Sequence, residues 1–355
     1  MRTIARSILL LSLAVVSEPA TARTLRVLTY NIHHSEGPFD GVYDLDRIAN
    51  VIKAANPDIV ALQELDQGNT RSGVNVFQLN RLAELTEMQG YFGKTINYAG
   101  GEYGNGILVS ADLDIVQTIN RPLPSPGGGE ARAVIEMKLS FDPDPATAEF
   151  IFLATHLDAS KNEANRNAQA TFINNLTERV TTPMLLAGDM NARPSTEPYG
   201  RLASTWTDAT NVANPGILRS SQIDYIFHRS AGAWEVVQQG QFIVNTTTTN
   251  ASDHYPLLTV FNLPYLNADF DGDYDVDGND LLVWQRHYGT AGSASQGDAN
   301  EDGQVDAADL QVWRAQFGTP RPQPSRATAI PEPRGATLIA WVIVLCQRRS
   351  RHGAH

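Results

Sequence analysis

The chain has 355 residues, of which 42% are hydrophobic and 19% charged, and its formal net charge is −12. This apolar content can bury a core, which excludes an intrinsically disordered chain, and the length predicts a large globular domain with appendages. The acidic balance argues against a strong nonspecific nucleic-acid binder, because such a protein normally presents a basic surface.

The N-terminus has the pattern of an export signal. Arg2 and Arg6 precede an apolar run from Ile8 to Val16, and Ala20-Thr21-Ala22 has the small-x-small form of a signal peptidase site. The apolar run is far shorter than the roughly 20 residues that span a bilayer. We therefore expect residues 1–22 to be a signal peptide and the mature protein to be extracellular or associated with the cell envelope. The single cysteine, Cys346, excludes an intrachain disulfide.

From residue 24 to residue 262, short strand-like runs alternate with helical patterns. Leu25 to Tyr30 predicts a strand, the helical spacing of Leu45 to Ile52 ends before Pro57, and Ile59 to Leu62 begins the next strand. A further helix is predicted over residues 163–180. The other predicted strands are Gly106–Ser110, Ala133–Leu139, Phe150–Ala154, Met184–Ala187, Ile223–Phe227 and Leu257–Phe261. Strands outnumber helices, which is typical of stacked sheets covered by helices.

Polar side chains stand where several of these strands begin or end. They are Asn31, Glu64, His156, Asp189, Asn191, Asp224, Asp253 and His254. Any one of them could simply be solvated at the end of an apolar strand. Taken together they offer complementary chemistry, so we expect them to gather at one rim of the sheets.

This set of side chains suits metal-assisted hydrolysis of a phosphoester. Carboxylate and amide oxygens are the hard ligands that Mg²⁺ or Mn²⁺ prefers, and two imidazoles without cysteines argue against a structural zinc site. Such an ion neutralises phosphate charge, while hydrolysis also needs a base for the water and donors around the developing charge. The inventory meets each requirement.

The motifs in this region resemble those of the endonuclease/exonuclease/phosphatase superfamily. They are TYNIHH (29–34), LQEL (62–65), GNGILVS (104–110), THLD (155–158), GDMNARP (188–194), IDYIF (223–227) and SDHYP (252–256). The resemblance covers about residues 24–262, with every main motif in order. It implies an α/β fold, a four-layer sandwich of two mainly antiparallel sheets flanked by helices.

The resemblance also implies roles for the metal-binding and water-activating residues. Glu64 would be the central metal ligand, with Asn31 and Asp253 in the metal shell or just outside it. Asp189 would position and activate the attacking water. Asn191 would hold either the phosphate or that aspartate.

The remaining roles concern contacts to the phosphate. By the same resemblance His254 would pair with Asp224 and, together with His156, donate hydrogen bonds to the phosphoryl oxygens. Weaker candidates for phosphate or scaffold contacts are Tyr103, Asn105 and Arg132, for which a solvated loop tyrosine and a surface arginine are equally plausible readings.

One position departs from the family pattern. His33 stands where some relatives carry an aspartate, which puts a second metal-binding role there in doubt. His33 and His34 could instead contact substrate, or be satisfied loop histidines.

Beyond about residue 263 the chain becomes acidic and contains an internal repeat. Residues 263–320 hold 2 Lys and Arg residues against 11 Asp and Glu residues, whereas residues 24–262 hold 16 against 26. Aligning Asp269 with Asp298 also brings Trp284 onto Trp313, among other coincidences. Each copy has an acidic loop followed by an apolar helical pattern.

Both loops follow the spacing of a calcium-binding loop, because oxygen ligands at alternate residues can wrap one cation. The candidate calcium ligands are Asp269, Asp271, Asp273, Asp275 and Asp280 in the first loop, and Asp298, Asn300, Asp302 and Asp309 in the second. Gly303 occupies the tight-turn position of the second loop, but Tyr274 occupies it in the first, so weaker binding is expected there. Residues 263–319 resemble a dockerin, a pair of Ca²⁺ loops that in some systems binds a cohesin partner.

The C-terminus is predicted to be a linker and a sorting signal. Residues 320–334 are rich in Pro, Arg and small residues. Residues 331–355, with Pro331-Glu332-Pro333, a short apolar run and terminal arginines, resemble a PEP-CTERM tail that is cut by sorting machinery.

The sequence leaves three functions open. The first is an exported phosphodiesterase or nuclease, with nucleic acid as one substrate class. The second is a hydrolase of small phosphoesters such as inositol phosphates or phospholipid head groups. The third is a noncatalytic scaffold in which the dockerin-like part carries the function. A monomer is expected in each case.

Overall fold

The computed structural model describes residues 23–318, apart from 142–148, 178–179, 181, 211–218, 230–233, 264–265, 274 and 301. The predictions for the signal peptide, the linker, the sorting tail and Cys346 therefore lie outside the described residues, as does Tyr274. Within the described part of the chain, the helices are all too short or too polar to cross a membrane.

Two six-stranded sheets form the centre of the main domain. The first sheet has the order β11 (Glu235–Phe242), β12 (Leu257–Leu263), β1 (Arg23–Asn31), β2 (Ile59–Gln67), β4 (Gly101–Val109) and β3 (Gln89–Tyr98). The second has the order β5 (Asp114–Pro122), β6 (Ala133–Ser140), β7 (Glu149–His156), β8 (Met184–Asp189), β10 (Asp224–Arg229) and β9 (Thr207–Asp208). Each sheet is mixed, because β1–β2 and β7–β8 are parallel pairs and the other pairs are antiparallel.

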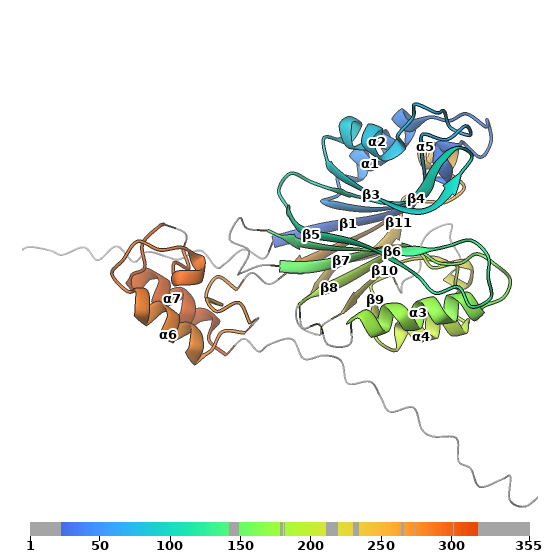
Figure 1. Cartoon of the computed structure of the whole chain (residues 1–355). Coiled ribbons are helices and arrows are strands. Elements are labelled where there is room, and N and C mark those ends of the chain that lie inside the picture. The colour runs from blue at the N-terminus through green and yellow to red at the C-terminus, as the bar shows by residue number, and fades with distance from the viewer. Residues whose placement is uncertain are drawn as a thin grey trace, which may run out of the picture. The chain divides into compact units, whose positions relative to one another are not determined.

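Helices cover the outer face of each sheet, which gives four layers (Figure 1). The helices α1 (Leu45–Ala55), α2 (Gln78–Thr86) and α5 (Thr246–Ala251) lie on the first sheet, and α3 (Ala164–Thr177) and α4 (Glu197–Ala203) lie on the second. The α/β fold of two sheets flanked by helices is confirmed. Short 3-10 turns, η1 (His33–Ser35) and η2 (Arg219–Ser221), lie in the connections.

Local sequence explains where α1 begins and ends. The Asp44 side chain accepts a hydrogen bond from the Arg47 backbone N–H at 2.9 Å, which caps the first turn. Asn56 adopts a left-handed conformation after the last turn, where the chain leaves the helix. Between these caps, Ile48 and Ile52 point one apolar stripe at the first sheet.

The central strands bury side chains on both faces. In β2, Ile59 and Ala61 belong to the apolar layer between the two sheets, whereas Val60 and Leu62 pack under α1 and α2. A third apolar layer lies under α3 and α4. Because no face of these strands meets water, their sequences are nearly continuous apolar runs.

The predicted strands and the observed strands differ in one systematic way. The eight predicted runs are β1, β2, β4, β6, β7, β8, β10 and β12, and the strands that the prediction omitted, β3, β5, β9 and β11, are the four edges of the two sheets. The omitted strands are largely exposed or half-buried, so they lack the apolar signal. The helix expected over 163–180 is α3, Ala164–Thr177.

The acidic segment contains two loops, each followed by a helix. The helices are α6 (Gly278–His287) and α7 (Ala307–Gln316), with a 3-10 turn, η3 (Ala294–Gln296), before the second loop. Asp280 Oδ1 accepts hydrogen bonds from the backbone N–H groups of Phe270 and Asp271 at 2.7 and 3.2 Å. Asp309 Oδ1 does the same for its own loop.

The two halves of this acidic segment exchange matching contacts. Trp284 Nε1 donates to the Asp306 carbonyl at 2.8 Å, and Trp313 Nε1 donates to the Asp277 carbonyl at 2.9 Å. Asp277 and Asp306 are themselves the N-caps of α6 and α7. The internal repeat in the sequence is therefore a structural repeat, in which each copy supports the start of the other copy's helix.

A half-buried histidine in β10 predicts that the main domain loses stability in acid. His228 packs edge-on against Phe261 at a centroid distance of 5.9 Å, and burial lowers its pKa. As the pH falls below the ordinary histidine pKa of about 6.5, the unfolded chain binds a proton that the folded chain does not, so stability is lost. In urea unfolding, we expect His228→Leu to lose less unfolding free energy between pH 7.5 and pH 5 than the wild type. Equal losses would contradict this assignment.

Candidate active site

The candidate residues meet at one rim because of the strand directions. Asn31 ends β1 and Asp189 ends β8, while Asp224 begins the antiparallel strand β10. Asn31 Nδ2 donates to Asp189 Oδ2 at 3.2 Å, across 158 residues and between the two sheets, and to Glu64 Oε1 at 3.0 Å. A single amide thus connects two carboxylates from different strands.

A bulge in β2 directs Glu64 toward this rim. The pairing of β2 with β4 shifts register between Leu62 and Leu65, and Glu64 lies between them with a left-handed φ of 63°. Such a conformation costs a non-glycine residue about 1–3 kcal/mol and tends to occur at functional sites. Burial raises the pKa of Glu64, but the polar groups around it, among them the hydrogen bond from the Asn31 amide, outweigh burial, so the net shift is downward. Glu64 is therefore a carboxylate at neutral pH.

Asp189 is the most enclosed acid of the group, with only 2% of its surface exposed. The backbone N–H of Asn191 donates to its Oδ1 at 2.8 Å, and Asn191 Nδ2 donates to the Leu157 carbonyl at 3.0 Å. Burial and the nearby Asp224 carboxylate raise the pKa of Asp189 well above its ordinary value. An acid with a raised pKa can act as a proton acceptor near neutral pH.

The two histidines beside Asp189 differ in protonation state at neutral pH. His254 Nδ1 lies 2.9 Å from Asp224 Oδ2. Burial lowers the pKa of His254, but Asp224 and Asp189 outweigh it and raise the pKa to about 10. For His156, burial and the Arg132 guanidinium, 3.2 Å from Nδ1, lower the pKa to about 3. His254 is thus a cation and His156 a neutral ring.

Both rings direct Nε2 at the same carboxylate oxygen. His156 Nε2 lies 3.5 Å and His254 Nε2 lies 3.7 Å from Asp189 Oδ2. In His156, Arg132 donates to Nδ1, so the ring proton resides on Nε2. Two N–H donors and one acceptor therefore face a common point.

The structure places the other predicted residues around this group. Asp253 is exposed, and its Oδ1 lies 3.4 Å from Ser252 Oγ. Asn105 Nδ2 donates to the Ala133 carbonyl at 3.3 Å, which ties β4 to β6 across the two sheets. Tyr103 is buried, and burial together with Glu64 raises the pKa of its phenol.

Sequence reasoning missed several residues that support the site. Ser252 Oγ donates to the Asn31 carbonyl at 2.8 Å and so fastens the SDHYP segment to β1. Gln78 Nε2 donates to the His34 carbonyl at 2.7 Å. Ser252 stands within a motif that the sequence showed, whereas Gln78 gave no signal because its partner is 44 residues away.

The donors at this rim fit a hard divalent cation. Glu64 offers an ionised carboxylate, and carboxylate oxygens of Asp189 and Asp224 lie within 4.8 Å of each other. Oxygen ligands of this kind are what Mg²⁺ or Mn²⁺ takes in proteins. The residues able to hold the ion are thus present on both sheets.

The acidic loops also bring carboxylates together. Ligand atoms of Asp269, Asp271 and Asp273 lie within 4.8 Å of one another, as do those of Asp275, Asp277 and Asp280. In the second loop, Asp298 Oδ2 accepts from the Gly303 N–H at 2.8 Å, and Asn300 Nδ2 donates to Asp302 Oδ2 at 3.1 Å. Gly303 has a left-handed φ of 82°, as the tight-turn position requires.

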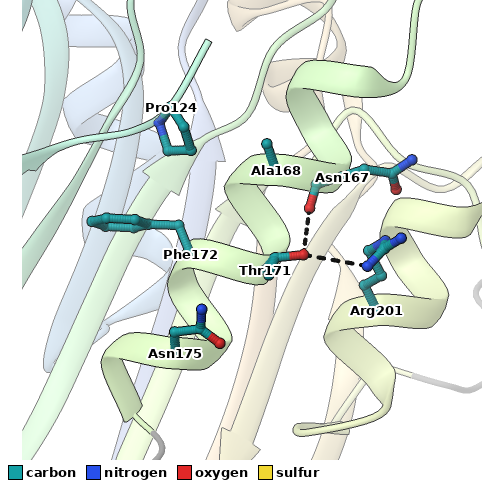
Figure 2. A pocket seen from close by; sticks show the side chains of 7 residues that line it. All are labelled: Pro124, Asn167, Ala168, Thr171, Phe172, Asn175 and Arg201. Carbon is teal, nitrogen blue, oxygen red and sulfur yellow. Dashed lines mark hydrogen bonds between the residues drawn. The ribbon is translucent and has the colours of Figure 1, made fainter. Parts of the chain in front are cut away.

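An open cavity of about 400 Å³ lies on α3 and α4, away from the candidate residues (Figure 2). Its lining includes Phe172, Thr171 and Arg201, and Arg201 donates to Thr171 Oγ1 at 3.4 Å. Thr171 Oγ1 in turn donates to the Asn167 carbonyl at 2.8 Å. These contacts join the two helices. The residues that line the cavity include no pair of an acid and a base that could serve catalysis.

Comparison with known proteins identifies relatives of the main domain. A model of the Endonuclease/Exonuclease/phosphatase family matches residues 28–254. The uncharacterized protein YbhP of Escherichia coli is 27% identical over 179 residues, which are 47% of this chain and 67% of YbhP.

Solved structures share the fold at low identity. The human Nocturnin catalytic domain, solved with a bound sulfate anion, has a TM-score of 0.54 and 22% identity over 68% of this chain and 94% of its own. The mannosyl-6-phosphatase Bt3783 of Bacteroides thetaiotaomicron has a TM-score of 0.53 and 20% identity over 67% of this chain and 99% of its own.

Gly188, the residue before Asp189, lies at a position with no room for a side chain. A Cβ at Gly188 would lie 1.9 Å from the Thr155 carbonyl oxygen, and its φ is +151°. We expect Gly188→Ala to reduce the free energy of unfolding by about 2 kcal/mol or more, because β7 and β8 must separate there. Gly200→Ala in α4, where a Cβ would meet nothing within 4 Å, is the matched control. It should gain up to about 1 kcal/mol. Similar stabilities of the two variants in urea would refute the steric argument.

Proposed function

The chain belongs to the endonuclease/exonuclease/phosphatase family, and on this premise we propose that it is an exported, divalent-metal-dependent phosphoester hydrolase of the phosphodiesterase or nuclease type. The observation that carries the proposal is the convergence on Asp189 of Asn31, His156 and His254. A buried acid with two imidazole donors directed at one of its oxygens, beside an ionised Glu64, matches what hydrolysis of a phosphoester requires.

Glu64 is proposed to hold Mg²⁺ (or Mn²⁺), with Asp253 at the exposed side of the site. A bound ion of this kind would neutralise phosphate charge and stabilise the leaving oxygen. Asn31 donates its amide to both carboxylates, so it fixes the position of Glu64 relative to Asp189. This contact supports a positioning role for Asn31 beside the metal.

Asp189 is proposed to orient the attacking water and accept its proton. Its raised pKa makes the carboxylate a better base than an exposed aspartate. Asn191 donates its backbone N–H to Asp189 and its side-chain amide to the Leu157 carbonyl. These two hydrogen bonds support the alternative in which Asn191 holds the aspartate and not the phosphate.

His254 and His156 are proposed to bind the phosphoryl oxygens through Nε2–H. The Asp224 carboxylate keeps His254 protonated, so its donor carries a positive charge that compensates the charge of the transition state. His156 supplies a neutral donor whose tautomer is set by Arg132. Arg132 thereby acts on the phosphate through His156.

The acidic main domain bears on the choice of substrate. Its 16 Lys and Arg residues against 26 Asp and Glu residues argue against tight binding of duplex DNA. A hydrolase of small phosphoesters, such as inositol phosphates or phospholipid head groups, is the second candidate. The fold is shared with a mannosyl-6-phosphatase as well as with Nocturnin, so the fold alone does not favour either class.

Isosteric substitutions test the catalytic assignment. With bis-(p-nitrophenyl) phosphate and Mg²⁺, Asp189→Asn and Glu64→Gln should each lower kcat/KM by about 10²-fold or more, because they remove the base and the metal carboxylate. Asp112→Asn, at an exposed turn, is the matched control and should keep wild-type activity. Equal rates in all proteins would reject catalysis and favour the scaffold. If the two variants lose activity as expected, assays of the wild type on DNA, sphingomyelin and inositol phosphates identify the substrate class.

We further propose that residues 263–319 form a dockerin-like pair of Ca²⁺ loops. The matched hydrogen bonds of Asp280 and Asp309, and the exchanged tryptophan contacts, support a duplicated module. Desolvation, followed by repulsion from the Asp280 and Asp273 carboxylates, raises the pKa of Asp271 to about 6. A divalent cation would relieve this repulsion. A cohesin-like partner, removal of residues 1–22, the linker at 320–334, sorting through residues 331–355 and a monomeric state complete the proposal.

Calorimetry on the whole chain tests the calcium loops. Ca²⁺ titrated into protein freed of metal should release heat from two sites, with the second loop the tighter one because it has Gly303. Asp298→Asn should weaken that tighter site by about tenfold or more, whereas Asp269→Asn should affect the weaker site. Absence of Ca²⁺ heat above the Mg²⁺ background would reject the loops.

A further inference from the structure

His34 is fixed in a strained place next to the proposed metal carboxylate. It lies in η1, where His33, His34 and Ser35 all have left-handed φ values of 46°, 42° and 66°. Only 5% of its surface is exposed, and its carbonyl accepts the Gln78 amide. The segment therefore holds the ring in one position at the cost of backbone strain.

The partners of His34 determine which ring nitrogen carries the proton. Nε2 lies 3.0 Å from Glu36 Oε2, and the Tyr43 hydroxyl donates to the same oxygen at 3.1 Å. An ionised carboxylate only accepts hydrogen bonds, so the proton of a neutral His34 resides on Nε2. Nδ1 is then left with a free lone pair.

That lone pair faces Glu64. Nδ1 of His34 makes no hydrogen bond to any residue that the structure describes, and it lies 3.8 Å from Glu64 Oε2. This separation is too long for a hydrogen bond. Two ligands on one cation with bonds of about 2.1 Å are separated by about 3.0 Å at right angles and about 4.2 Å when opposite. The observed 3.8 Å falls within that range.

We propose that Nδ1 of His34 is a ligand of the divalent ion that Glu64 holds, and that it makes the site prefer Mn²⁺ to Mg²⁺. Glu36 and Tyr43 fix the ring from behind, an arrangement common in metal sites, where the second nitrogen of a ligating histidine donates to a carboxylate. An imidazole ligand favours first-row transition ions, whereas Mg²⁺ prefers oxygen alone. This inference rests on the proposed metal role of Glu64.

His33 offers the rival arrangement. Ligand atoms of His33, His34 and Glu36 also lie within 4.8 Å of one another, so these three residues form a second group that could hold an ion. His33 is only half-buried, and its Nδ1 lies 3.3 Å from the Glu36 carbonyl oxygen. Nδ1 of His33 is thus already engaged, whereas Nδ1 of His34 is not.

The test uses the full chain, stripped of metal and loaded with Mn²⁺. Pulsed electron paramagnetic resonance detects ¹⁴N coupled to bound Mn²⁺, and calorimetry gives the Mn²⁺ and Mg²⁺ affinities. His34→Asn keeps a residue that tolerates the left-handed backbone, and His33→Asn is the matched control. We expect His34→Asn to lose a ¹⁴N coupling and about tenfold or more in Mn²⁺ affinity, with a smaller effect on Mg²⁺. His33→Asn should keep both.

Glu36→Gln provides a second variant if His34→Asn unfolds. It keeps the ligand ring and removes the charge that fixes its proton, so the Mn²⁺ affinity and the ¹⁴N coupling should both fall. Unchanged coupling and an unchanged Mn²⁺ to Mg²⁺ ratio in His34→Asn, or their loss in His33→Asn, would overturn the inference. Glu64→Gln distinguishes a failure of the His34 inference from a failure of the proposed metal role of Glu64. Wild-type Mn²⁺ affinity in this variant would overturn the metal role of Glu64 itself.

Discussion

The amide of Asn31 is the contact on which the candidate site depends. It donates to Glu64 within its own sheet and to Asp189 of the opposite sheet, so the distance between the two sheets sets the distance between the two acids. The apolar layer between the sheets keeps that distance fixed. Close packing in the core therefore holds the acids at the rim at fixed distances from one another.

Around this link, neighbouring charges give similar residues different properties. Asp224 keeps His254 protonated, whereas burial and Arg132 keep His156 neutral. Glu64 remains ionised while Asp189 holds its proton more tightly. A charged ring, a neutral ring, an ionised carboxylate and a buried acid of raised pKa thus arise from three amino-acid types, histidine, glutamate and aspartate. Local strain at Glu64 and His34 is part of the same arrangement, because left-handed backbone directs both side chains to the rim.

The fold could be predicted from the sequence wherever burial left an apolar pattern. Central strands such as β2 and β8 bury both faces and gave clear runs, and the helical spacing of apolar residues predicted α1. Edge strands such as β3 and β11 did not, because their exposed faces take polar residues and only pairing with a neighbour makes them strands. The acidic repeat was visible as a repeat, but the exchanged tryptophan contacts were not.

The sequence by itself determined which chemical groups the protein has and that most of them stand at or next to strand ends, because motif and period are local properties of the chain. Glu64 is the exception, since it lies at a bulge within β2. It also indicated the family through the order of its motifs. Only the tertiary structure decided that Asn31 meets Asp189, that Arg132 faces His156, and that Nδ1 of His34 lies 3.8 Å from Glu64 Oε2. Protonation and tautomer depend on neighbours brought together by folding, and no spacing along the chain encodes those distances.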